Sequence, residues 1–220
     1  MPTYFKARST TKRANALLSK GDYCGAKALY LELEKMHMVN FMIYHNIASI
    51  YFQEHDWIKA QEYFLKAIQL NSESAVSYSS LSEAYLRLRR WKDAEAAMEK
   101  ALAADPVNYF LEKRLEKVKD NKWRERHVDS LDMTDEGLAL LKEKKNDEAL
   151  NRFERSVQLE ETNATAHYLC GTMYLNKTEY KKAIISFSRA MELEPSNREY
   201  AVMMQAAQSK AREALNKEDA

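Results

Sequence analysis

The sequence predicts an all-α fold, a solenoid of antiparallel helix pairs, and three observations carry this prediction. Apolar side chains recur in short stripes with the three- and four-residue spacing of a helix face. Pairs of these stripes repeat at a period of 34 residues along most of the chain. Gly and Pro are scarce, at 4 and 3 of 220 residues, and the alternating runs typical of strands are missing. Because one such hairpin cannot bury its own apolar faces, neighbouring pairs must stack.

Residues 75–108 show the helix pair most clearly. The first stripe has side chains at i, i+3, i+4 and i+7, namely Tyr78, Leu81, Ser82 and Tyr85. The second stripe again has helical spacing and consists of Trp91, Ala94, Met98, Ala101 and Leu102. The break between the stripes, at Arg89 and Arg90, predicts the turn. Asp105-Pro106 predicts the end of the second helix, because proline cannot continue a helix.

The same pattern predicts four more helix pairs, in residues 7–40, 41–74, 130–163 and 164–197. Each first helix has a small residue at the position where its partner crosses closely: Ala14, Ala48, Ser82, Gly137 and Gly171. Each second helix has an alanine at its own fixed position: Ala26, Ala60, Ala94, Ala149 and Ala183. This 34-residue pattern of an aromatic, a small residue, Tyr, Ala-x3-Phe and Pro resembles the tetratricopeptide repeat family. The resemblance implies five repeats, a tetratricopeptide-repeat α-solenoid and no enzymatic activity.

The predicted organisation has two arrays of repeats. Residues 1–108 form an array of three repeats, and residues 130–197 form an array of two. Residues 109–129 between them are an extra helix and a linker. Residues 198–220 are a C-terminal capping helix and tail, because a terminal repeat needs a cover with a polar outer side. The apolar face of this cap consists of Tyr200, Met204, Ala207, Ala211 and Leu215.

The segment between the arrays departs from the repeat pattern. One helix face in it is apolar and holds Leu111, Leu115 and Val118. Its small-residue position is occupied by Glu116, so we expect this helix to cover the open end of the first array. The polar residues 121–132 predict a linker, with Asp132 as the cap of the next helix. The arrays are then either two blocks with some play or one continuous superhelix, and the sequence leaves both open.

Charge and cysteine content limit the classes of function. Lys and Arg number 34 and Asp and Glu 33, for a net charge of +1, which argues against bulk attraction to nucleic acid or anionic membranes. Basic residues cluster at the turns between helices, but acidic neighbours interrupt them. The sequence has no apolar stretch long enough to span a membrane and no targeting segment, and Cys24 and Cys170 set up no disulfide framework. These features predict a cytoplasmic protein.

Motifs for catalysis or metal binding are missing from the sequence. The five histidines form no ligand pair with cysteines or carboxylates, and there is no phosphate-binding loop or nucleophile motif. His167 stands where the repeat pattern has an aromatic residue, so we expect a packing role for it. We therefore expect no enzyme activity, no cofactor and no metal site.

The family resemblance implies where a partner binds. Tetratricopeptide proteins line a concave groove with the second, fifth, ninth and twelfth to thirteenth positions of each first helix. In this chain the candidate groove residues are Asn15, Met42, His45, Asn46, Ser49, Phe52, Gln53, Ser79, Glu83, Leu86, Arg87, Tyr168, Thr172 and Asn176. Polar and apolar side chains alternate among them, which suits an extended peptide or a helix held by hydrogen bonds and a few apolar anchors.

We therefore expect a protein–protein interaction scaffold or adaptor that holds a peptide or helix of a partner protein. One alternative is a self-assembling solenoid whose groove or terminal helix binds another copy of the chain. A second is a co-chaperone that grips the terminal carboxylate of Hsp70 or Hsp90. Asn15 and Asn46 match the two asparagines of that family's clamp. Its basic positions, however, hold Thr11, Val76 and Ser80, so the cations that a carboxylate needs are missing there.

Overall fold

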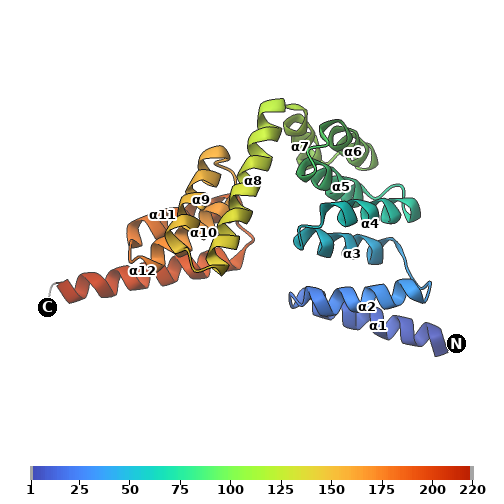
Figure 1. Ribbon diagram of the computed structural model, residues 1–220, viewed down its shortest axis with the longest axis horizontal. Helices are drawn as coiled ribbons and strands as arrows, with labels where there is room; N and C mark the ends of the chain where they lie inside the picture. Colours follow the sequence, from blue (N-terminus) through green and yellow to red (C-terminus); the bar gives the residue numbers. More distant parts are fainter. Residues whose placement is uncertain (1, 219–220) are drawn as a thin grey trace. The chain divides into compact units, whose positions relative to one another are not determined.

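The computed structural model describes residues 2–218, and this part of the chain consists of α-helices without a strand. Figure 1 shows the helices in chain order. They are α1 (Pro2–Ser19), α2 (Tyr23–Lys35), α3 (Phe41–Gln53), α4 (Trp57–Leu70), α5 (Ala75–Arg87), α6 (Trp91–Ala104), α7 (Tyr109–Lys119), α8 (Asn121–Lys142), α9 (Asn146–Leu159), α10 (Ala164–Asn176), α11 (Tyr180–Leu193) and α12 (Arg198–Glu218). The predicted all-α solenoid of helix pairs is confirmed.

The chain divides into two compact units, Met1–Arg124 and Glu125–Ala220, which we call unit 1 and unit 2. Unit 1 contains the pairs α1/α2, α3/α4 and α5/α6, followed by α7 and the first turn of α8 (Figure 1). Unit 2 contains the rest of α8 with α9, then the pair α10/α11 and the helix α12. Helices α3, α5 and α10 begin at the first residue of a predicted 34-residue window.

Each helix pair is held by a small residue on the first helix opposite a large side chain on the second. The small residues predicted for the crossing are all buried. The predicted alanines of the second helices are fully buried as well. At one fixed position the second helices carry the large side chains of the core, namely Tyr30, Phe64, Met98, Phe153 and Phe187. A methyl group built on Gly171 would lie 2.7 Å from the ring of Phe187, so the packing is tight.

The turn inside each pair has the same geometry in all five repeats. One residue per turn adopts a positive φ, and these residues are Gly21, His55, Arg89, Lys144 and Thr178. The next residue in the chain donates its N–H to a carbonyl five positions back, as Glu179 does to Tyr174 at 2.9 Å. This is the Schellman arrangement, which satisfies carbonyls at the end of the first helix. Only one of the five turns uses the glycine that a positive φ favours.

The connection between repeats ends in a capping residue at a fixed position. At the last residue of each window, an Asn or Ser side chain accepts a hydrogen bond from the backbone of the next helix. These residues are Asn40, Ser74, Asn108, Asn163 and Asn197. The caps satisfy donors that the helix itself cannot, and they begin each new repeat at the same phase.

The prediction of a linker over residues 121–132 is wrong, because α8 is helical from Asn121 onward. Its buried face is made largely of polar side chains, so the sequence pattern does not mark it as a helix face. His127 Nδ1 lies 2.6 Å from Glu160 Oε2. Further along the helix lies a closed hydrogen-bond network of buried groups, contributed by Ser130, Thr134, Ser156 and Asn163. Asp132 lies inside α8 and caps no helix.

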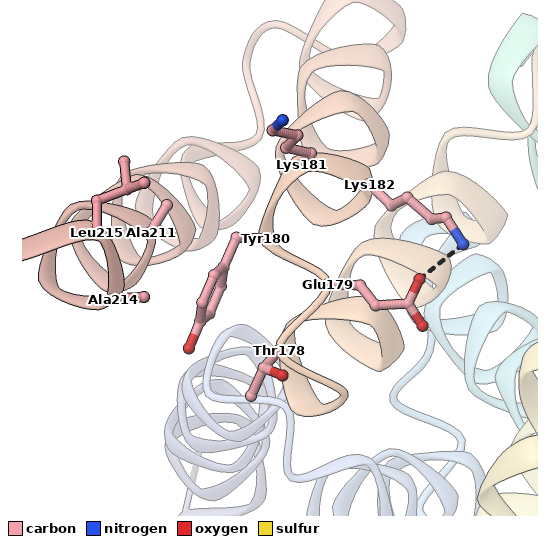
Figure 2. A pocket seen from close by; sticks show the side chains of 8 residues that line it. All are labelled: Thr178, Glu179, Tyr180, Lys181, Lys182, Ala211, Ala214 and Leu215. Atoms are coloured by element: carbon pink, nitrogen blue, oxygen red, sulfur yellow. Dashed lines mark ion pairs between the residues drawn. The ribbon is translucent and has the colours of Figure 1, made fainter. Parts of the chain in front are cut away.

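The C-terminal helix α12 packs on α11 through its first three turns. Ala207 is fully buried against Ala183 and Phe187, and Tyr200 is buried near Ala190. The last turns of α12 line a hollow of about 670 Å³ beside the start of α11, formed by Thr178, Glu179, Tyr180, Lys181, Lys182, Ala211, Ala214 and Leu215 (Figure 2). Leu215, predicted on the packing face, is therefore exposed.

The replacement Thr178→Gly is expected to stabilise unit 2 by about 1 kcal/mol, because a β-branched residue at φ 60° is strained. Thermal and urea unfolding followed by circular dichroism would measure the change. The matched control is Lys177→Gly, since Lys177 precedes it in the same turn with φ −85° and gains nothing from glycine. An equal or lower stability of the Thr178 variant would contradict the prediction.

The replacement Gly171→Ala is expected to destabilise unit 2 by roughly 1–2 kcal/mol. The added methyl group collides with the buried ring of Phe187, and this cost outweighs the gain in helix propensity. Urea unfolding of the single variant would show the loss. Combining it with Phe187→Leu should recover part of that loss, since the smaller side chain makes room. A Gly171→Ala chain as stable as the wild type would show that the crossing is looser than these contacts indicate.

Candidate functional site

Four of the candidate groove residues of unit 1 line a hollow between α3 and α5. Its volume is about 210 Å³, and its lining residues are Ser49, Phe52, Gln53, Phe64, Ser80 and Glu83. Four of these six were predicted, and the structure adds Phe64 and Ser80. Aromatic rings form the floor, whereas hydroxyl, amide and carboxylate groups lie at the rim. This combination suits an apolar side chain whose own backbone bonds to the polar rim.

Aromatic packing fixes one end of this hollow. The Phe52 ring lies edge-on to Trp57 with ring centroids 4.7 Å apart. The guanidinium carbon of Arg87 lies 4.4 Å from the centroid of the Trp57 ring, so Arg87 is held by a cation–π contact. Both predicted residues are half-buried. They therefore present restrained surfaces, which lose little side-chain entropy when a partner binds.

Asn15 and Asn46 both bond to a buried tyrosine. The hydroxyl of Tyr30 donates to Asn15 Oδ1 at 2.6 Å and accepts from Asn46 Nδ2 at 3.0 Å. Burial raises the pKa of Tyr30, and the hydrogen bond from Asn46 opposes this shift. The two asparagines therefore have a structural explanation, because they satisfy a hydroxyl group that would otherwise be unpaired in the core.

His45, the residue before Asn46 on α3, is an uncharged packing residue. Its Nδ1 lies 3.2 Å from Ser77 Oγ, and its ring contacts Phe64 at a centroid distance of 5.3 Å. Burial lowers the pKa of His45, so the uncharged form predominates at neutral pH. The hydroxyl of Ser49 donates to the His45 carbonyl at 3.0 Å. Met42, one turn earlier, is exposed.

The prediction that Leu86 contacts a partner is wrong. Its side chain is 0% exposed. In unit 2, Leu175 occupies the same repeat position and is likewise buried, against Ala183 and Phe187 of the following helix. This position therefore belongs to the core of the pair. The neighbouring positions Ser79 and Glu83 remain accessible on α5.

The three candidate residues of unit 2 lie on α10. Two of them, Tyr168 and Thr172, form hydrogen bonds within unit 2. The Tyr168 hydroxyl donates to Glu199 Oε1 at 2.7 Å, and its ring stacks on Tyr200 at 5.1 Å. Burial and the neighbouring Glu199 raise the pKa of Tyr168 to about 12. The Thr172 hydroxyl donates to the Tyr168 carbonyl, and Asn176 is exposed at the end of the helix. None of these three residues lines the hollow beside the start of α11 or the one next to Cys170.

Helix α7 contributes residues that the sequence analysis missed. Arg114 forms an ion pair with Glu83, which joins α7 to the accessible side of α5. Helix α7 begins 34 residues after α5, so it keeps the phase of a first helix. The sequence contains this 34-residue spacing, but the charged Glu116 at the small-residue position argued against a further repeat. Val118, one turn after Arg114 on α7, is fully buried, as predicted.

Metal-binding clusters are missing from the described residues, and the thiol of Cys170 is not activated. Among them, no three His, Cys, Asp or Glu side chains gather where they could hold a metal ion. Cys170 is buried, and burial raises the pKa of its thiol to about 12, so it forms a poor nucleophile. None of the helices described is both long and apolar enough to cross a bilayer.

Comparisons with known proteins show what the chain is similar to. Two sequence models of the tetratricopeptide repeat family match residues 40–106 and 134–198. The Arabidopsis OM64 tetratricopeptide domain has a TM-score of 0.50 and 20% identity, over 54% of this chain and 98% of that chain. The second tetratricopeptide domain of human RPAP3 was solved with the HSP70 peptide SGPTIEEVD. It has a TM-score of 0.50 and 22% identity, and the match covers 54% of this chain and 99% of that chain. The first tetratricopeptide domain of Spaghetti (RPAP3), bound to the HSP90 peptide SRMEEVD, has 25% identity and a TM-score of 0.48. This match covers 51% of this chain and 90% of that chain.

Proposed function

Because the chain belongs to the tetratricopeptide repeat family, we propose that it is a non-enzymatic scaffold that holds a segment of a partner protein on unit 1. The segment lies across α3 and α5, where most of the candidate residues gather. Proteins of this family are interaction modules, and in the described part of this chain no three His, Cys, Asp or Glu side chains gather where they could hold a metal ion.

The hollow between α3 and α5 is the observation that carries the proposal. Its aromatic floor of Phe52 and Phe64 accepts an apolar side chain, and Ser49, Gln53 and Ser80 at its rim can bond to a peptide backbone. The surrounding contacts hold these groups in place before a partner arrives. Such preorganisation lowers the entropic cost of binding.

The double replacement Gln53→Arg and Ser80→Arg is expected to block the hollow and to remove one protein from those that crosslink to the wild-type chain in cells. Neither side chain carries a contact of the core, so circular dichroism should show an unchanged fold. The matched control is Gln69→Arg with Ser72→Arg, because both residues are exposed at the end of α4 and beyond it, away from the hollow. Quantitative mass spectrometry of the crosslinked partners would compare the three chains.

An identical set of partners in all three chains would contradict the proposal. If the crosslinked species that disappears is a second copy of this chain, the self-assembling alternative replaces the scaffold. A rise in mass with concentration, measured by analytical ultracentrifugation, would then accompany the loss.

The co-chaperone alternative predicts binding of the peptides that the two RPAP3 domains hold, and we expect this chain not to bind them. Thr11 bonds to the Ala7 carbonyl, Val76 is apolar, and Arg114 is already paired with Glu83. A buried carboxylate without a cation costs several kcal/mol. Fluorescence anisotropy with labelled SRMEEVD and SGPTIEEVD should show a Kd weaker than about 1 mM. Binding in the micromolar range, lost on blocking the terminal carboxylate, would establish the clamp instead.

A further inference from the structure

A hollow in unit 2 takes no part in the proposed function. It is lined by α9 and α11, the second helices of their repeats, and by α10, and its volume is about 720 Å³. Ligand pockets typically measure about 300–1,000 Å³. We call it the Cys170 hollow, after the buried residue of α10 that lines it. Val157 and Ile185 contribute apolar walls, and Ile185 is 69% exposed. The hollow can therefore bury an apolar group of a ligand.

Two residues of α10 that line the hollow are smaller than their counterparts in unit 1. His167 stands at the fourth position of its 34-residue window, where the windows of α3 and α5 have Tyr44 and Tyr78. Cys170 stands at the seventh position, where those two windows have an isoleucine and a leucine. Protein interiors are closely packed, so the smaller side chains leave space that the larger ones would fill. The hollow is thus a feature of this repeat and does not follow from the repeat pattern.

A cation at a fixed position of the second helix accompanies the tyrosine in unit 1. The ammonium group of Lys66 lies 5.8 Å from the centroid of the Tyr44 ring, and that of Lys100 lies 5.8 Å from the centroid of the Tyr78 ring. Arg189 occupies the same window position on α11 and lines the Cys170 hollow. Its repeat has a histidine in place of the tyrosine, so the cation–π contact of the other two repeats lacks its ring here.

His167 adds a hydrogen-bond acceptor to the lining of the hollow. Its Nε2 lies 3.1 Å from the carbonyl oxygen of Glu161, which can only accept, so Nε2 carries the proton. Burial lowers the pKa of His167, so the ring is uncharged at neutral pH. Nδ1 of this tautomer has a lone pair and accepts a hydrogen bond. A ligand hydroxyl group can therefore donate to His167.

The charges around the hollow disfavour an anionic ligand. The carboxylate-bearing residues Glu154 and Glu161 line it, and the carboxylate of Glu154 accepts a hydrogen bond from the hydroxyl of Tyr174. The guanidinium group of Arg189 is paired with Glu192 at 2.8 Å. A phosphate or a carboxylate would therefore meet more negative than positive charge, whereas an uncharged hydroxyl group finds acceptors. An uncharged ring with a hydroxyl group fits both the walls and the charges.

From these features we infer that the Cys170 hollow binds a tyrosine side chain of a partner protein. The ring of this tyrosine packs between Val157 and Ile185 and lies against the guanidinium group of Arg189. Its hydroxyl group donates to Nδ1 of His167. The partner thus supplies the ring that unit 1 has in its own repeats. The site lies in unit 2 and involves second helices, so it is separate from the α3 and α5 surface of the proposed function.

The test is an NMR titration of the full chain, labelled with nitrogen-15, with N-acetyl-tyrosinamide as the probe. We expect a Kd of about 1 mM and shifts of the backbone amide signals of Cys170, Ile185 and Arg189. The phenylalanine analogue lacks the hydroxyl group and should bind about fivefold more weakly. The phosphotyrosine analogue should bind more weakly still, because its phosphate meets the carboxylates. The lysine analogue has no ring and should not shift these signals.

Two variants, each with a matched control, locate the binding. His167→Tyr fills the hollow with the ring that unit 1 has at this position and should abolish binding, whereas His37→Tyr makes the same change at an exposed residue of unit 1. Arg189→Gln removes the cation and should weaken binding about threefold to tenfold. Its control is Arg155→Gln, at the same window position on α9 but outside the hollow. Both controls should leave Kd within about twofold, and circular dichroism checks each fold.

Unchanged signals at the hollow, equal Kd values for the tyrosine and phenylalanine analogues, or equal losses in variants and controls would overturn the inference. Tighter binding of the phosphotyrosine or lysine analogue would overturn it as well. A rise in mass with concentration that His167→Tyr abolishes would overturn it in favour of a tyrosine from a second copy of this chain. The crosslinking experiment on Gln53→Arg with Ser80→Arg tests unit 1 alone, so the scaffold function and this site stand or fall separately.

Discussion

The close crossing of two helices within each repeat is the contact on which the rest of the structure depends. A small residue on the first helix lets the large side chain of the second helix, such as Phe187 opposite Gly171, fill the space between them. This packing sets the angle of the pair and thereby the side of the first helix that stays accessible. The accessible positions then recur every 34 residues. Surface chemistry in unit 1 is consequently organised by the core.

The proposed binding face is rigid because core contacts extend into it. Asn15 and Asn46 bond to the buried Tyr30 hydroxyl, and Arg87 is held against Trp57. These side chains belong to both the packing and the surface, which explains why replacing them would disturb both. Gln53 and Ser80, at the rim of the hollow, are better probes of binding, since their side chains leave the core contacts intact.

The two units carry different surfaces on the same architecture. In unit 1 the first helices α3 and α5 line a hollow, and Met42 and Val76 on them are exposed. In unit 2, Tyr168 on the first helix α10 is engaged by Glu199 and Tyr200. The fold therefore sets which positions of the first helices are accessible, whereas the residues at those positions give each unit its own surface.

The sequence by itself determined the helix pairs, their period and most of their core. The reason is that small residues at each close helix crossing, and the large side chains opposite them, recur at fixed positions. It also placed Ser49, Phe52, Gln53 and Glu83 on the face that contains the hollow. The tertiary structure alone decided that α8 is one helix, since its buried face is largely polar and bonds to Ser156, Glu160 and Asn163 of other segments. It likewise decided that Leu86 is buried and that α7 is joined to α5 by the ion pair between Arg114 and Glu83, because burial and contact depend on which neighbouring helix covers a residue.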